Sequence, residues 1–151
     1  MAETKPVVLF LCIANTARSQ IAEVLFRHHA RDRLSAISAG LEPGEAVDPL
    51  AIRALEEKGL DATGLRPKHV REFLGTVRVT TAISVCSKAA EACPTLWPGL
   101  VDILYWPIDD PAAVEGNEEQ RLAAFRSARD IIEAKILEWL GRAHAGLVTE
   151  S

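Results

Sequence analysis

The chain has few cysteines, few aromatic residues and no long apolar run. Among its 151 residues are three cysteines, one tyrosine and one methionine. A secreted domain held by disulfides normally carries an even number of cysteines, so this class is disfavoured. No apolar run approaches the roughly 20 residues of a membrane span, and residues 1–5 lack the apolar core of a signal peptide. We therefore expect a cytoplasmic protein without membrane association.

An excess of positive charge is also missing. The formal net charge is -4, with 17 Lys and Arg against 21 Asp and Glu, whereas a nucleic-acid-binding protein is normally basic. The cysteines lack CxxC pairs and the four histidines form no ligand pattern with them, so no metal site is expected. The length suits one domain. We expect a monomer with a single domain over residues 1–151 and a frayed tail after about residue 142.

Apolar runs and amphipathic segments alternate along the chain, which predicts alternating strands and helices. Strands are predicted at Val7–Leu11, Ser35–Ala39, Val77–Val85 and Val101–Trp106; helices are predicted at about 18–33, Pro49–Lys58, near Val70–Leu74 and from Asn117 to Gly141. This order predicts an α/β fold, a three-layer open sheet of about four parallel strands with helices on both faces. Ligands of such sheets bind at the carboxyl ends of the strands.

The termini of two helices carry recognisable signals. Asp48 before Pro49 predicts a helix start, and Gly59 predicts its end. Asn117 can form a capping box with Gln120 at the start of the last helix. A stripe at helical spacing there predicts core packing rather than a cofactor site; its residues are Leu122, Phe125, Ile132, Ile136 and Leu140, with Trp139 at the edge. Gly141 is predicted to end this helix.

The first predicted loop contains Cys12 and, six residues later, Arg18. Backbone N–H groups at a helix start, the helix dipole and an arginine fork together favour binding of a tetrahedral oxyanion. The same environment should lower the pKa of Cys12 and make its thiolate a nucleophile. The candidate binding residues are Ile13, Ala14, Asn15, Thr16, Ala17, Arg18 and Ser19. Asn15 tolerates left-handed backbone geometry, and the Ser19 hydroxyl can donate to the Cys12 sulfur. The spacing alone is equally consistent with a buried core cysteine.

An acidic pair, Asp109 and Asp110, follows the fourth predicted strand and precedes Pro111. A carboxylic acid at that edge of the sheet could protonate a leaving oxygen. Aspartate before proline is also common at turns and helix caps. Both interpretations stay open at this point.

The other two cysteines, Cys86 and Cys93, are seven residues apart. Seven residues of α-helix rise about 10.5 Å, whereas a disulfide needs Cα atoms within about 7 Å. The intervening residues favour a helix, so a disulfide between these cysteines would have to unwind it, with a change in the environment of Trp97. The alternative is a pair of unrelated thiols.

Together these features resemble the low-molecular-weight protein tyrosine phosphatase fold family and, within it, the thioredoxin-coupled arsenate reductases. The segments that carry the resemblance are Cys12–Glu23, Ser38–Gly40, Cys86–Pro94 and Trp106–Ala112. The resemblance implies that Cys12 attacks arsenate, that Arg18 and the loop amides hold the oxyanion, and that Asp110 is the general acid, with Asp109 as its rival.

The resemblance also implies a relay of disulfides. Cys86 would attack Cys12 and release arsenite, Cys93 would then attack Cys86, and thioredoxin would reduce the Cys86–Cys93 disulfide. No organic cofactor is implied. Some members bind potassium near the equivalents of Asn15 and Glu23; a further carboxylate of that site has no match, because Pro67 and Lys68 fall in the region. The sequence leaves potassium binding open.

Two other functions compete with this interpretation. A phosphatase acting on phosphotyrosine would share the anion loop, but such enzymes carry aromatic residues after the Asp-Pro pair, where this chain has Ala112 and Ala113. A phosphatase also has no use for the pair Cys86 and Cys93. The second competitor is a redox sensor without enzymatic activity, in which the thiol state controls a partner.

Overall fold

The computed structural model describes residues 7–31, 33–73, 76–86 and 102–150, with side chains as far as residue 142. Four parallel strands form one sheet in the order β2-β1-β3-β4. They are β1 (Val7–Cys12), β2 (Ser35–Gly40), β3 (Val79–Ser84) and β4 (Asp102–Tyr105); the helices are α1 (Arg18–Ala30), α2 (Pro49–Glu56) and α4 (Glu118–Glu150), with short 3₁₀ turns η1 (Val70–Glu72) and η2 (Pro111–Ala113). The predicted α/β fold with four parallel strands is confirmed.

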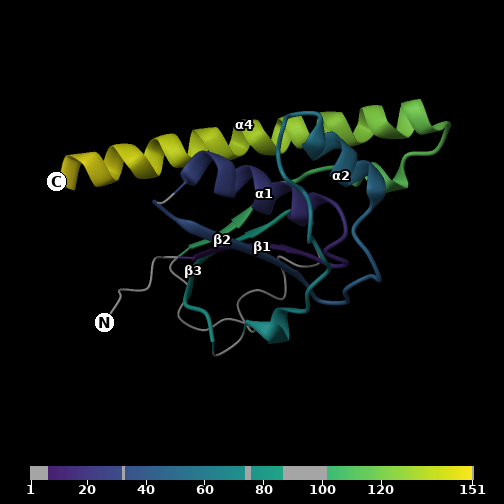
Figure 1. The fold of residues 1–151 in the computed structure, drawn as a ribbon. Coiled ribbons are helices and arrows are strands. Elements are labelled where there is room, and N and C mark those ends of the chain that lie inside the picture. The colour runs from purple at the N-terminus through teal and green to yellow at the C-terminus, as the bar shows by residue number, and fades with distance from the viewer. Residues whose placement is uncertain (1–6, 32, 74–75, 87–101, 151) are drawn as a thin grey trace.

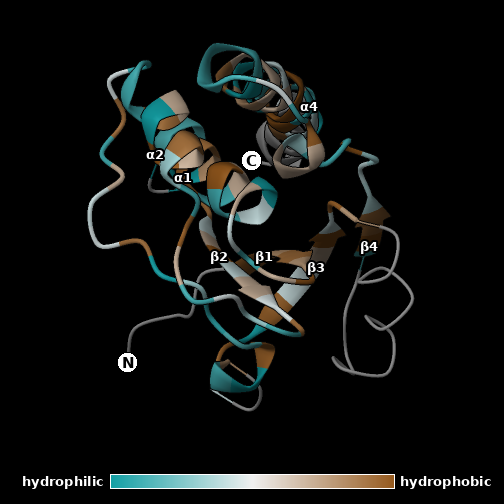
Figure 2. Ribbon diagram, turned by 90° about the vertical axis from the view of Figure 1, so that its right-hand side faces the viewer, coloured by the Kyte–Doolittle hydropathy of each residue, from teal (hydrophilic) through white to brown (hydrophobic). Residues whose placement is uncertain are grey.

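Helical elements lie on both faces of the sheet, but unequally in the described part. Figures 1 and 2 show α1, α2 and α4 together on one face, where they pack on the larger apolar cluster with Phe10 of β1. On the other face, η1 contributes Val70 to a smaller cluster with Leu9 and Leu11. Strand β1 is buried along its whole length, which explains why its sequence is continuously apolar rather than alternating.

The predicted helix starts are confirmed by their hydrogen bonds. The Oδ1 of Asp48 accepts from the N–H of Leu50 at 2.9 Å and caps α2. Asn117 and Gln120 bond reciprocally at 2.9 and 2.8 Å, which is the predicted capping box. The apolar stripe of α4 is fully buried except for Leu140, which is 6 % exposed. It therefore packs in the core, as its spacing predicted.

The predicted end of the last helix is wrong. Helix α4 does not stop at Gly141 but continues to Glu150. A glycine inside a helix costs only about 1 kcal/mol relative to alanine. The space around Gly141 is open, because nothing lies within 4 Å of a Cβ built on it, so no close contact requires a glycine there. The flanking sequence, rich in alanine and other helix formers, outweighs that cost.

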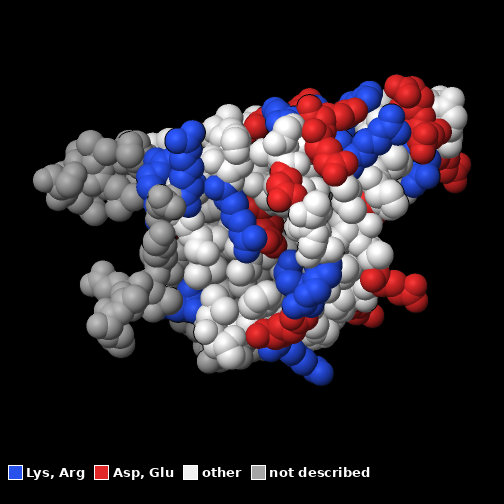
Figure 3. Space-filling model, viewed as in Figure 1, with Lys and Arg blue, Asp and Glu red and all other residues white. Residues whose placement is uncertain are grey.

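Charged side chains of both signs are interspersed over α2 and α4 on the face seen in Figure 3. Ion pairs join these two helices: Glu57, which follows α2, pairs with Arg126 and Arg129 of α4. Within the described ranges, no helix combines the length and the apolarity needed to cross a membrane. The helix predicted after Cys86, together with Cys93 and Trp97, lies outside the described residues.

Candidate active site

The parallel register brings the chemically reactive segments to one edge of the sheet. Cys12 is the last residue of β1, and Cys86 lies two residues beyond β3. The N–H of Val85 donates to Leu11 O at 3.0 Å, and the N–H of Trp106 donates to Ser84 O at 2.9 Å. The ends of β1, β3 and β4 are thus joined directly, as ligand sites in open α/β sheets require.

The loop after β1 is held from outside through its carbonyl groups. N–H groups of segment 41–48 donate to four of them, at 2.8 to 3.3 Å; the carbonyls belong to Cys12, Ile13, Ala14 and Thr16. Within the described part of the chain, the N–H groups of residues 14–18 donate to no acceptor. A run of successive backbone N–H groups without acceptors is the feature from which anion-binding loops are built.

Helix α1 begins at this loop without the usual neutralising groups. Its N-cap residue, Ala17, offers no side-chain acceptor, and the first turn contains no acidic residue. The positive end of the helix dipole therefore stays available to a ligand. The oxyanion loop over residues 13–19 stays a prediction, with which this open helix start is compatible.

The loop is shaped by Asn15, which has a left-handed φ of 55° and is fully buried. Its Nδ2 donates to Ser19 Oγ at 2.7 Å, and its Oδ1 accepts from Gln20 Nε2 at 2.9 Å and from the N–H of Lys68 at 2.8 Å. The side chain thus faces the protein interior and supports the loop, while an anion would meet only its backbone. The predicted tolerance of left-handed geometry is confirmed.

A close approach between β2 and the loop requires Gly40. A Cβ at this position would lie 2.5 Å from Ile13 O and 3.1 Å from the backbone N of Asn15. Gly40 is the register partner of Cys12. Only a residue without a side chain lets β2 end beside the loop.

Arg18 spans the distance from α1 to the ends of β3 and β4. Its Nη1 donates to Val85 O at 3.2 Å and to Ile108 O at 2.8 Å, and its side chain is only 14 % exposed. Its Nη2 lies 3.9 Å from Oδ2 of Asp110. Asp110 also caps η2 by accepting from the N–H of Ala112 at 3.0 Å. Asp110 is therefore a cap, as the turn interpretation predicted, and it also faces Arg18; its role as a general acid stays a prediction.

Cys12 and Cys86 are not joined in a disulfide, and their thiols share a hydrogen bond. This hydrogen bond and burial raise the pKa of Cys12 above its ordinary range, although the charge of Arg18 and the N–H of Ile13 act in the opposite direction. The expectation of a lowered pKa is therefore wrong for this state of the site. The sequence correctly indicated the groups that lower the pKa of Cys12, but it gave no sign of the neighbouring Cys86 thiol. When two thiols interact this closely, the pair loses its second proton only at higher pH.

Three supporting residues were not foreseen from the sequence. The carbonyls of Val85 and Ile108 hold Arg18, and the buried Gln20 donates to Asn15 O and Arg66 O at 3.0 and 2.7 Å. The first two could not be found by any motif, because a backbone carbonyl leaves no mark in the sequence. Gln20 gives a weak signal, as a polar residue two positions after Arg18 on the buried side of a helix.

Among the described residues, no group of three His, Cys, Asp or Glu could hold a metal ion.

Residues 7–147 match the family described as low molecular weight phosphotyrosine protein phosphatase. The chain belongs to this family. A relative named arsenate reductase, from Shouchella clausii, is 35% identical over 88% of this chain and 94% of its own length. The solved structure of a thioredoxin-dependent arsenate reductase of Corynebacterium glutamicum is 25% identical with a TM-score of 0.73, over 97% of this chain and 65% of that one. The arginine phosphatase YwlE of Geobacillus stearothermophilus, 21% identical with a TM-score of 0.81 over 97% of each chain, shares the fold.

Proposed function

We propose that the chain is an arsenate reductase in which Cys12, Cys86 and Cys93 form a disulfide relay regenerated by thioredoxin in the cytoplasm. The observation that carries the proposal is the hydrogen bond between the thiols of Cys12 and Cys86 at the mouth of an anion loop. The relative from Shouchella clausii supports the substrate, and the neighbour from Corynebacterium glutamicum supports the thioredoxin.

The first step is attack of the Cys12 thiolate on the arsenic of arsenate. The N–H groups of residues 14–18 and the guanidinium of Arg18 hold the oxyanion, and the arriving negative charge favours transfer of the Cys12 proton to an arsenate oxygen. Asp110 protonates the oxygen that leaves as water. A sulfur–arsenic(V) bond replaces one arsenic–oxygen bond, and no oxidation state has yet changed.

In the second step, the Cys86 thiolate attacks the sulfur of Cys12. The electron pair of the sulfur–arsenic bond passes to arsenic, which leaves as arsenite(III), while the two thiols are oxidised to a Cys12–Cys86 disulfide. A thiol pair that is already in hydrogen-bond contact needs little movement for this attack. The hydrogen bond between the thiols of Cys12 and Cys86 supports this step.

The third step transfers the disulfide. Cys93 attacks Cys86 and frees the Cys12 thiolate for the next arsenate. The Cys86–Cys93 disulfide then accepts two electrons from the dithiol of thioredoxin by ordinary thiol–disulfide exchange. In this step a helix between Cys86 and Cys93 would have to unwind, because helical spacing holds their Cα atoms farther apart than a disulfide allows.

Phosphate and arsenate are tetrahedral oxyanions, so the loop alone does not separate a reductase from a phosphatase. Hydrolysis of a phosphocysteine needs water beside Cys12, where this chain has the Cys86 thiol. After Asp110, the N-cap of η2, come Pro111 and two alanines rather than an aromatic residue that could stack on a tyrosyl ring. We infer that phosphatase activity is a weak side reaction of the same loop.

The decisive experiment couples arsenate to NADPH oxidation through thioredoxin and thioredoxin reductase. The wild-type protein should consume NADPH only when arsenate, thioredoxin and the reductase are all present. Cys93→Ser should stop after one turnover and accumulate a Cys12–Cys86 disulfide, visible by peptide mass mapping. Turnover that does not need thioredoxin, or a Cys93→Ser protein that cycles at the wild-type rate, would contradict the relay.

A further inference from the structure

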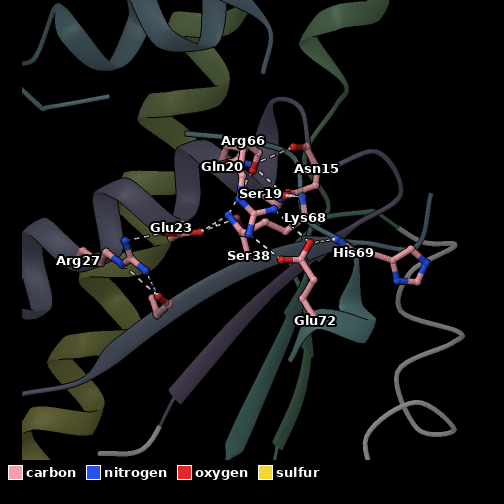
Figure 4. Close-up of polar contacts among 11 residues, drawn as sticks. Asn15, Ser19, Gln20, Glu23, Arg27, Ser38, Arg66, Lys68, His69 and Glu72 are labelled. Atoms are coloured by element: carbon pink, nitrogen blue, oxygen red, sulfur yellow. Dashed lines mark hydrogen bonds and ion pairs between the residues drawn. The ribbon is translucent and has the colours of Figure 1, made fainter. Parts of the chain in front are cut away.

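A buried carboxylate lies behind the anion loop. Glu23 of α1 is 3 % exposed. Its Oε1 accepts from Ser38 Oγ of β2 at 2.6 Å and lies 3.2 Å from Lys68 Nζ, while its Oε2 lies 3.0 Å from Nη1 of Arg27. Figure 4 shows these side chains converging from α1, β2 and the segment around Lys68. One buried negative charge is thus compensated by two cations of the chain itself.

The ammonium group of Lys68 lies at the centre of this arrangement. Besides Glu23, its Nζ donates to Ser38 Oγ at 3.3 Å and to Arg66 O at 3.5 Å. The Lys68 side chain is only 13 % exposed, although lysine is normally a surface residue. A carboxylate, a hydroxyl and a backbone carbonyl are oxygen ligands of the kind that an unhydrated monovalent cation prefers.

The backbone of Lys68 connects this centre with the loop. Its N–H donates to Oδ1 of Asn15 at 2.8 Å, and its carbonyl accepts from the N–H of Gly40 at 2.8 Å. Gln20 completes this hydrogen-bond network, because its Nε2 donates to Asn15 Oδ1 and to Arg66 O. The position of Lys68 therefore bears directly on the left-handed residue that shapes the oxyanion loop.

A potassium ion does not fit here. The oxygens that would surround it, from Glu23, Ser38 and Arg66, are engaged by Lys68 Nζ. An additional cation would face the positive charges of Lys68 and Arg27 with a single carboxylate to balance all three, which is strongly unfavourable at a buried site. The potassium site left open by the sequence is thus filled by a residue of the chain.

We propose that Lys68 is a positioning residue whose ammonium group replaces a bound monovalent cation and holds Asn15 and the oxyanion loop in their binding geometry. The protein is consequently indifferent to potassium. The proposal rests on the proposed function only in that the loop binds an oxyanion, and inorganic phosphate serves as the probe.

Two substitutions separate the charge of Lys68 from its volume. Lys68→Ala removes the ammonium group and opens space for an ion, whereas Lys68→Met removes the charge and keeps the space filled. Phosphate affinity is measured on the whole protein as protection of Cys12 from iodoacetamide, alongside the thermal unfolding midpoint. Both are measured in potassium, ammonium or tetramethylammonium chloride at equal ionic strength. Lys58→Met is the matched control, because Lys58 pairs with Glu133 away from the loop.

Wild type and Lys58→Met should behave alike in all three salts. In tetramethylammonium chloride, both Lys68 variants should lose about 10–100-fold in phosphate affinity, the usual effect of removing a residue behind a ligand shell. Potassium or ammonium should restore the affinity and raise the unfolding midpoint of Lys68→Ala, and should not restore Lys68→Met. This recovery by a specific ion would not occur if Lys68 were only a packing residue.

Three results would overturn the proposal: potassium-dependent phosphate binding by the wild type, unchanged affinity in Lys68→Ala, or a loss in Lys68→Ala that no cation restores. If phosphate failed to protect Cys12 even in the wild type, the oxyanion loop and the proposed function would fail. The potassium-specific shift of the unfolding midpoint in Lys68→Ala would still decide the role of Lys68.

Discussion

The thiols of Cys12 and Cys86 are hydrogen bonded to each other, although 74 positions separate them in the sequence. The contact exists because β1 and β3 are adjacent parallel strands that end at the same edge of the sheet. It has two chemical consequences. The hydrogen bond to Cys86 raises the pKa of Cys12, and in the proposed relay it leaves Cys86 beside the sulfur that it would attack.

The first prediction concerns the pKa of Cys12. Cys86→Ala removes the largest cause of its elevation and leaves the opposing charge of Arg18 in place. The thiolate should therefore form at lower pH, and the pH midpoint of alkylation of Cys12 by iodoacetamide should move downward. Cys86→Ser, whose uncharged hydroxyl can donate a hydrogen bond to the Cys12 thiolate, should lower the midpoint at least as far. An unchanged midpoint in Cys86→Ala would show that burial, and not the neighbouring thiol, controls Cys12.

The same substitution should separate two activities. Cys86→Ala removes the attacking sulfur of the second step, so arsenate reduction should be lost. Hydrolysis of p-nitrophenyl phosphate should persist or increase, because water can reach a phosphocysteine more easily without the Cys86 thiol. Cys12→Ser, in contrast, should abolish both activities, since one nucleophile serves both. Substantial turnover of either substrate by a folded Cys12→Ser protein would exclude Cys12 as the nucleophile.

A third prediction tests which aspartate is the general acid. Asp110 faces Arg18 at 3.9 Å, so Asp110→Asn should slow the first chemical step by about 10²–10⁴-fold, the usual contribution of a general acid. Asparagine is as good a helix cap as aspartate, so the cap of η2 should survive the change. Asp109→Asn is the matched comparison and should react at nearly the wild-type rate. Single-turnover kinetics with phosphate affinity measured alongside would reveal a reversal of the two roles.

The sequence predicted those parts of the molecule in which one segment carries its own signal. The buried strand β1, the cap at Asp48 and the capping box at Asn117 were all predicted correctly, because each has a signal within its own segment: a continuous apolar run for β1 and a polar capping residue at each helix start. The end of α4 was not, since the cost of one glycine is small compared with the helix preference of its neighbours.

The site shows the same division. Cys12 and Arg18 flank one short loop, so their spacing in the sequence was enough to identify them together. The elevated pKa of Cys12 depends on a thiol from another strand, and Lys68 meets Glu23 from 45 positions away. A pattern along the chain carries no information about which of many polar residues will meet across the fold.

The last prediction concerns Gly40, where β2 and the oxyanion loop approach each other most closely. In Gly40→Ala, the new Cβ would lie 2.5 Å from Ile13 O, which is a backbone atom that cannot rotate away. The loop must shift, so phosphate protection of Cys12 should weaken, and overpacking should destabilise the fold by about 1–3 kcal/mol. Gly141→Ala is the control, because nothing lies within 4 Å of the added Cβ and the residue is inside α4. It should leave phosphate binding unchanged and stabilise the fold by up to about 1 kcal/mol through helix propensity. Thermal unfolding and alkylation protection of both variants would test these expectations. A Gly40→Ala protein with normal phosphate affinity would mean that the loop does not depend on the close approach of β2.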